Sequence, residues 1–179
     1  MDDCRIIELY NHGNSEEAFR QIVDKYSEQL YWHIRRFACC HEDTNDLLQE
    51  TFIKVWAALP GFRQEARLYT WIYRIATNEA LNYLRKNRIK SILKLESSEN
   101  LLIRKIEEDP YFNGREIERE LLKAVQKLPE RQRTVFNLRY FDEMKYEDMA
   151  EILGTSVGAL KASYHHAYKK VKSEIEEKF

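Results

Sequence analysis

Residues 68–88 combine aromatic rings, amides and basic side chains at helical spacing. At about 100° per residue, one side of such a helix is apolar and is expected to face the core; it holds Leu68, Ile72, Ile75 and Ala76. Another strip holds Trp71, Arg74, Asn78, Asn82 and Arg85. Aromatic rings stack on unpaired bases, guanidinium groups bind phosphates, and amides hydrogen-bond base edges. The strip is therefore suited to single-stranded nucleic acid, although core aromatics on a solvated helix would give the same pattern.

A second candidate surface lies between residues 46 and 56. Its polar side chains recur at helical spacing; they are Asp46, Gln49, Glu50 and Lys54. The opposite, inward face is expected to hold Leu47, Leu48, Thr51, Phe52, Val55 and Trp56. Paired acids on a helix could signal a di-metal site, but that site needs Glu-x-x-His partners on other helices, and the sequence has none. The pattern favours a protein-docking face, with a plain solvated face as the alternative.

The third candidate lies in residues 146–169. A short helix is expected to end at Gly154, because a left-handed C-cap favours glycine, and Ser156 is expected to cap the next helix. This is a helix-turn-helix pattern. The predicted exposed side of the second helix consists of Gly158, Lys161, Ala162, His165, His166 and Lys169. Small residues permit close approach to the major groove, lysines contact phosphates, and imidazoles read bases or phosphates; an αα-hairpin without DNA is the alternative.

The net charge of −1 hides an asymmetry along the chain. Residues 63–94 hold 8 Lys/Arg and 2 Asp/Glu, a net charge of +6, and residues 155–172 hold 4 Lys and no acid, a net charge of +4. Between them, residues 95–120 hold 4 basic and 8 acidic side chains, a net charge of −4. Two basic patches separated by an acidic stretch indicate two nucleic-acid contacts.

Several classes of function find no support in the sequence. The cysteines at positions 4, 39 and 40 fit no common zinc spacing, so no metal site is expected. There is no glycine-rich phosphate loop and no nucleophile–base pair, so we expect neither an enzyme nor a cofactor. An apolar run of 18 residues is also missing, and the N-terminus lacks a signal-peptide pattern, which predicts a cytoplasmic protein without membrane insertion.

The elements that position these candidates are expected to be helices alone. Turns are few because the chain has only five Gly and three Pro. The predicted helices span residues 5–12, 15–39, 46–59, 68–88, 115–127, 130–141, 146–153 and 157–177. Thr44 or Asn45 is the expected cap of the third helix, and residues 89–113 have weak periodicity. We therefore predict an all-α fold of two small helical domains, 1–90 and 115–179, joined by a flexible acidic linker, 91–114, that is partly ordered at most.

Taken together, these segments closely resemble bacterial RNA polymerase sigma factors of the extracytoplasmic-function (ECF) group, in the sigma-70 family. The segments that match the family's sequence motifs are Asp46 to Trp56, Phe62-Arg63, Tyr69 to Asn78, Leu81 to Arg85, Leu128 to Arg133 and Tyr146 to Lys161. Each motif alone is only moderately specific for the family, but the order and spacing of all of them make the match strong.

The resemblance implies a factor that binds core RNA polymerase, at its clamp and flap, and directs it to promoter DNA. It implies that Asp46, Gln49, Glu50, Thr51 and Lys54 bind the polymerase. It implies that the −10 element is opened and held by Phe62, Arg63, Tyr69, Trp71, Arg74, Asn78, Arg85, Lys86 and Arg88. It implies that the −35 duplex is read by Arg131, Ser156, Gly158, Lys161, Ala162, His165, His166 and Lys169. An anti-sigma factor is a further partner that the resemblance allows.

The chain departs from the family pattern in its recognition helix. Many members carry an arginine there, in a Val-Lys-Ser-Arg motif. This chain instead has Leu-Lys-Ala-Ser over residues 160–163, followed by Tyr164-His165-His166. Which side chains read −35 bases is left open by the sequence. The basic tail after residue 84 is also shorter than in many members, which predicts a shallower salt dependence of non-specific binding.

Three other readings compete with a sigma factor. A stand-alone helix-turn-helix regulator that binds duplex DNA would explain residues 146–169 but not the aromatic-basic helix. A helical metal-dependent hydrolase lacks a ligand set. A protein-interaction module would leave both basic patches as solvated faces.

Overall fold

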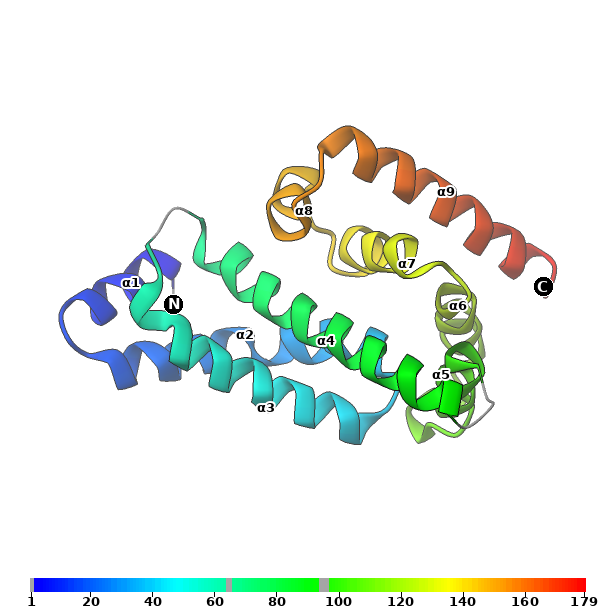
Figure 1. Ribbon diagram of the computed structural model, residues 1–179, viewed down its shortest axis with the longest axis horizontal. Helices are drawn as coiled ribbons and strands as arrows, with labels where there is room; N and C mark the ends of the chain where they lie inside the picture. Colours follow the sequence, from blue (N-terminus) through cyan, green and yellow to red (C-terminus); the bar gives the residue numbers. More distant parts are fainter. Residues whose placement is uncertain (1, 64–65, 94–96) are drawn as a thin grey trace.

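The computed structural model describes residues 2–63, 66–93 and 97–179 (Figure 1). Its α-helices are α1 (Asp3–Asn11), α2 (Ser15–Ala38), α3 (His41–Ala58), α4 (Leu68–Leu93), α5 (Ser98–Glu107), α6 (Glu116–Gln126), α7 (Glu130–Phe136), α8 (Tyr146–Leu153) and α9 (Val157–Glu176). Short helical turns are η1 (Leu59–Gly61), η2 (Pro110–Phe112) and the π-helical η3 (Asn137–Phe141). The described residues contain no β-strand, and the all-α prediction is confirmed.

Helices α2, α3 and α4 form the N-terminal bundle, with α1 packed on α2. Their apolar faces meet in a core that includes Leu30, Ile34, Val55, Ile72 and Ala76, all fully buried. This is the helix face that the spacing in residues 68–88 predicts. The polar strip of α4 is consequently turned away from the bundle core.

The start of α3 differs from the prediction. The helix begins at His41, with Cys40 as its N-cap, so neither Thr44 nor Asn45 caps it. The Thr44 hydroxyl instead donates to the Cys40 carbonyl at 2.6 Å and is buried within the first turn. Acidic side chains in that turn, Glu42 and Asp43, stabilise a helix N-terminus, and this signal outweighs the capping pattern.

Helices α8 and α9 form the predicted helix-turn-helix. Gly154 ends α8 in the left-handed conformation, with φ of 60°. The Ser156 hydroxyl accepts a hydrogen bond from the Ala159 amide at 3.3 Å and caps α9. Both turn predictions are confirmed, because glycine tolerates positive φ and serine satisfies a free amide at a helix start.

The predicted linker is more ordered than expected. Its described part contains α5 and η2, and Leu102, Ile106 and Phe112 are buried in a cluster with Ala80 and Leu84 of α4. We expected this segment to be flexible, and that expectation is wrong for residues 98–112. Its ten-residue helix has too few turns to give clear periodicity, and its apolar partners lie far away in the sequence.

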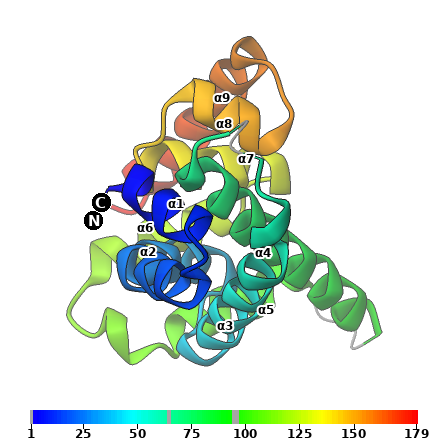
Figure 2. The same ribbon diagram turned by 90° about the vertical axis from the view of Figure 1, so that its left-hand side faces the viewer.

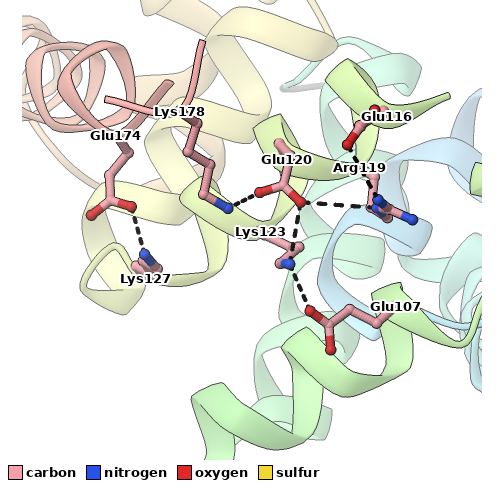
Figure 3. Close-up of polar contacts among 8 residues, drawn as sticks. All are labelled: Glu107, Glu116, Arg119, Glu120, Lys123, Lys127, Glu174 and Lys178. Carbon is pink, nitrogen blue, oxygen red and sulfur yellow. Dashed lines mark hydrogen bonds and ion pairs between the residues drawn. The ribbon is translucent and has the colours of Figure 1, made fainter. Parts of the chain in front are cut away.

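An ionic cluster fixes α5 against α6 and the end of α9 (Figure 3). The carboxylate of Glu120, only 8% exposed, lies between Lys178, Lys123 at 3.2 Å and Arg119 at 3.9 Å. Lys123 also donates to Glu107 of α5 at 2.6 Å, and this hydrogen bond lowers the pKa of the Glu107 carboxyl. The outer pairs of the cluster are Glu116–Arg119 and Lys127–Glu174. Glu120 therefore lies at the centre of the contacts between the linker and the C-terminal helices.

The C-terminal helices lie directly on the N-terminal bundle (Figures 1 and 2). Helix α8 contacts α4, and η3 contacts α2. Leu138 and Met149, from the C-terminal half, are buried in the same apolar cluster as Leu30 and Ile72. The two halves share a core in this closed arrangement, and the domain boundaries 1–90, 91–114 and 115–179 stay a prediction.

Candidate nucleic-acid interface

The side chains of the polar strip of α4 differ in their exposure to solvent. Asn78 is exposed, whereas Trp71 is half-buried. The Trp71 ring lies 4.9 Å from the Phe62 ring, at an interplanar angle of 44°, and both pack against the core. Because packing fixes these two rings at the junction of loop and helix, they form a preorganised edge against which a base can stack.

Two other aromatic residues of α4 face inward. Tyr73 is 3% exposed, and its ring lies 4.5 Å from that of Tyr69. The Tyr69 ring is 6.4 Å from Tyr26 of α2, and burial raises the pKa of Tyr69 to about 12. The structure thus turns Tyr69, a predicted −10 contact, largely into the bundle. Its spacing alone did not separate a core tyrosine from a DNA-facing one.

Basic side chains follow the strip, and several have acidic partners in the C-terminal half. Arg74 Nη2 donates to the Glu151 carbonyl at 2.9 Å and lies 3.8 Å from its carboxylate. Arg67, just before α4, pairs with Asp148. Further along, Arg85 lies 3.7 Å from Glu130.

Arg67 belongs to the same basic segment but is not among the predicted −10 contacts. Only the fold reveals its pairing, because its partner is 81 positions away. Arg63, Lys86 and Arg88 are exposed. Exposed basic side chains thus lie just before α4 and along its second half.

The outward face of α3 carries the predicted docking residues, with one exception. Asp46, Gln49 and Glu50 are exposed, and Lys54 pairs with Glu79 at 2.6 Å. Thr51 is fully buried on the inward face of α3, where its hydroxyl is satisfied by donating to the Leu47 carbonyl at 2.7 Å. Thr51 therefore offers no surface to a partner in this arrangement.

Two exposed apolar residues on the same helix are not among the predicted docking residues. Ile53 is 60% exposed and Trp56 is 43% exposed, although the pattern placed Trp56 on the inward face. The Trp56 ring packs edge-on against Phe19 of α2, with centroids 5.0 Å apart. Exposed aromatic and aliphatic side chains beside polar ones are typical of the anchors of a protein-docking surface.

The recognition face of α9 is open along its length. The six residues predicted for it, Gly158, Lys161, Ala162, His165, His166 and Lys169, are all exposed. Leu160, Ala167 and Val171 anchor the opposite face in the core. Arg131 on α7 and Ser156 at the turn are exposed as well. The helix thus presents an exposed face of small residues, lysines and histidines, a composition that is compatible with major-groove binding.

Metal binding and membrane insertion find no structural support within the described ranges. There, no three His, Cys, Asp or Glu side chains are grouped so that they could hold a metal ion. Cys39 is buried, Cys40 is half-buried and Cys4 is exposed, each as a free thiol. No helix in the described part of the chain combines the length and the hydrophobicity that crossing a membrane requires.

Two family models match the chain, one on each side of α5. The model of Sigma-70 region 2 matches residues 22–89, which include α3 and most of α4. The model of Sigma-70, region 4 matches residues 118–171, which include the helix-turn-helix. Each of the three candidate surfaces therefore lies within a segment that matches sigma factors.

Full-length relatives agree with these models. The chain is 31% identical to the ECF RNA polymerase sigma-E factor of Haemophilus influenzae, over 98% of this chain and 96% of that protein. It is also 31% identical to the RNA polymerase sigma-H factor of Pseudomonas aeruginosa, over 92% of this chain and 89% of that protein.

Solved structures share the fold. One, of CnrH in complex with the cytosolic domain of CnrY, superposes with a TM-score of 0.72 at 22% identity, over 98% of this chain and 97% of that chain. Another, of the sigma factor RpoE with the anti-sigma factor NepR from Bartonella quintana, gives a TM-score of 0.65 at 20% identity, over 88% and 96%. From the family models and the full-length relatives, we conclude that the chain belongs to the ECF RNA polymerase sigma factors of the sigma-70 family.

Proposed function

We propose that this sigma factor divides promoter recognition between its two halves after it binds core RNA polymerase. Helix α9 reads the −35 element as duplex, and the α4 surface captures unpaired bases of the −10 element. The observation that carries this proposal is the pairing of an open, basic recognition helix with a preorganised aromatic-basic surface in one chain. A stand-alone regulator of duplex DNA would have no use for the second surface, and the relatives do not favour that reading.

At the −35 element, small residues and lysines of α9 have separate tasks. Gly158 and Ala162 lie four positions apart on the exposed face, which lets the helix backbone approach the groove floor. Lys161 and Lys169 contact phosphates on either side. His165 and His166 remain as the side chains that reach base edges, where other family members use an arginine.

At the −10 element, stacking offsets the cost of strand opening. Unstacking a base costs a few kcal/mol, and stacking on an aromatic ring returns about 1–3 kcal/mol per base. The ring pair of Phe62 and Trp71 supplies such a platform, and Asn78 supplies hydrogen bonds to a base edge. Arg63, Arg74 and the basic tail hold the backbone. Capture of one or two bases can thus favour an open complex without ATP.

The exposed face of α3 docks on the polymerase clamp. Asp46, Gln49 and Glu50 supply its polar contacts, and Ile53 and Trp56 supply apolar anchors. The chain acts in the cytoplasm, where core polymerase is. An anti-sigma factor is a second protein partner under this proposal, since one of the solved relatives was crystallised with such a factor.

Transcription in vitro with core polymerase and a genomic promoter library tests the proposal. Holoenzymes with Trp71→Ala or Asn78→Ala are expected to form open complexes at least about tenfold less well than wild type, as the loss of one stacked or hydrogen-bonded base implies. Asn45→Ala, an amide removed from α3, serves as the matched control. Promoter opening at the wild-type level by both α4 variants would reject the proposal that α4 captures bases of the −10 element.

A further inference from the structure

A small pocket lies among residues of α4, α5 and α7, where α5 packs on α4 and on α6 (Figure 1). Its cavity of about 170 Å³ is smaller than the roughly 300–1,000 Å³ of sites for drug-sized ligands, so only a small molecule fits it. Its apolar walls are Leu84 of α4, Leu102 of α5 and Leu128 between α6 and α7. Of the residues with proposed contacts to DNA or polymerase, only Arg88 lines it.

Arg133, on α7, supplies a buried cation to this pocket. Its side chain is 8% exposed, and its Nη1 donates to the carbonyl and the side-chain Oε1 of Gln126 at 3.3 and 3.1 Å. Gln126 is itself fixed, since its Nε2 donates to the Arg36 carbonyl of α2 at 3.0 Å. Arg133 Nε is buried without a hydrogen-bond partner, and no hydrogen bond or ion pair within the described residues holds Nη2. The edge that Nε and Nη2 form is therefore unsatisfied.

An unsatisfied guanidinium edge can bind an oxyanion. Its two N–H groups donate parallel hydrogen bonds to two oxygens of a carboxylate or a phosphate. Burial lowers the pKa of Arg133, but an arginine stays charged at neutral pH. The described part of the chain thus holds a buried positive charge without a carboxylate paired to it, and such a charge is costly unless an anion neutralises it.

Two carboxylates in the same pocket restrict which oxyanion it can take. Glu99 of α5 is exposed, and Glu130 of α7 is half-buried and lies 3.7 Å from Arg85. Both acids would repel a phosphate, with its charge of about −1.5 to −2, more strongly than a carboxylate. The same acids can accept hydrogen bonds from an ammonium group. The lining therefore matches a carboxylate at one end, an ammonium at the other and an aliphatic body between the leucines.

We propose that this pocket binds a free aliphatic α-amino acid, with its carboxylate on Arg133 and its ammonium on Glu99 and Glu130. The walls come from the N-terminal bundle, the linker and the C-terminal half, so a bound amino acid holds these three parts together. By mass action it stabilises the arrangement that forms the pocket. The proposal goes beyond promoter recognition and does not rest on it, since it concerns the chain without polymerase or DNA.

Isothermal titration calorimetry of the full-length chain with L-leucine tests the proposal. Two analogues each lack one charged end: isocaproate has no ammonium, and isoamylamine has no carboxylate. We expect both to bind at least about tenfold more weakly than L-leucine, as the loss of a hydrogen-bonded charge implies. Absence of leucine binding, equal affinity for leucine and isocaproate, or tighter binding of inorganic phosphate than of leucine overturns the proposal.

Substitutions in the pocket locate the binding. Arg133→Lys keeps the positive charge but removes the planar edge, so it should weaken leucine binding about ten- to hundredfold. Arg131→Lys, at an exposed position of the same helix, is the matched control.

The second pocket variant does not disturb the interior, because Glu99 is exposed. Glu99→Gln should weaken leucine binding about threefold, as the loss of an exposed charge pair implies, and leave isocaproate binding unchanged. Glu42→Gln removes an exposed acid from the first turn of α3 and is its control. Wild-type affinity for leucine in a folded Arg133→Lys variant, or in Glu99→Gln, contradicts the proposal.

The reactivity of Cys39 shows whether leucine binds at this junction. Cys39 is buried in the cluster that contains Leu84 and Leu102, two walls of the pocket. A thiol reagent reaches it only when α5 detaches, and that detachment also breaks the pocket. At a leucine concentration about ten times the dissociation constant, Cys39 should react about tenfold more slowly, whereas the exposed Cys4 should keep its rate. A Cys39 rate that leucine leaves unchanged contradicts binding in this pocket.

Discussion

Helices α4 and α9 both carry basic faces for which we propose contacts with DNA, yet only one is free of other helices in this arrangement. The face of α9 is exposed along its whole length, whereas α8 holds Arg74 on α4 and Arg67 just before it. Duplex recognition needs only an open helix face, and duplex DNA is always present. Under the proposed function, α4 captures unpaired bases, and this capture is useful only after polymerase has docked. Both surfaces are basic, so they differ less in charge than in whether other helices of the chain cover them.

Removing the apolar contact beneath α8 should have the largest effect on this comparison. Met149→Ala deletes a fully buried side chain from the shared core and should lower the free energy of unfolding by about 3 kcal/mol. It should also free the α4 surface, because α8 loses its anchor. Urea denaturation followed by circular dichroism measures the first effect. Ile53→Ala, at a position 60% exposed, is the control and should change stability by less than about 0.5 kcal/mol.

A cost for Met149→Ala as small as that of the control would show that α8 does not depend on the shared core. The two basic faces would then differ for a reason other than the packing of α8. The same variant allows a second measurement, because its affinity for single-stranded DNA should rise while its free energy of unfolding falls.

A third surface, the face of α3, sharpens the comparison because it is open for a protein rather than for DNA. Asp46→Ala with Glu50→Ala should weaken binding to core polymerase about tenfold, as the loss of two interface charges implies. The fold should be unchanged, since both residues are exposed. Asp24→Ala with Glu28→Ala removes two exposed acids at the same spacing from α2 and should leave the affinity unchanged. Unchanged affinity in the α3 variant, measured by fluorescence titration with core polymerase, would reject this face.

The smallest expected effect concerns the reactivity of the thiols, which depends on whether α5 stays packed on the bundle rather than on the position of α8. Burial raises the pKa of Cys39 to about 12, so at pH 8 only about one molecule in ten thousand carries its thiolate. Cys4 is exposed and should react first with a thiol reagent. Cys39 lies in the cluster that α5 completes with Leu102 and Ile106, so it should become reactive only when the linker detaches.

Thiol titration of a variant that weakens the contact of α8 with α4 distinguishes two ways in which the C-terminal half could separate from the bundle. A slow Cys39 in the variant with Asp148→Asn and Glu151→Gln indicates that α8 lifts while α5 stays in place. A fast Cys39 in that variant would mean that the whole C-terminal half and the linker move together.

Local sequence signals predicted most of the helices and the exposed face of α9. Gly154 and Ser156 specify their turn through their own backbone preferences, and the apolar spacing in α4 specifies its buried side. These features depend on near neighbours in the chain. The family resemblance then assigned roles that the local patterns left open.

Features that depend on distant partners were missed. Tyr69 is turned inward by ring contacts that spacing does not reveal, and α5 is ordered by apolar side chains of α4. The pairing of Arg67 with Asp148 joins residues 81 positions apart. No periodicity predicts such a contact, because it exists only once both halves have folded together.

Transcription from paired promoter variants tests the division of labour most directly. Holoenzymes with Lys161→Ala and with Asn78→Ala are each assayed on a promoter from the library and on versions with either the −35 or the −10 element scrambled. The account predicts that Lys161→Ala loses its effect only when the −35 element is scrambled, and that Asn78→Ala loses its effect only when the −10 element is scrambled. A defect of Lys161→Ala that persists without the −35 element, or of Asn78→Ala without the −10 element, would contradict it.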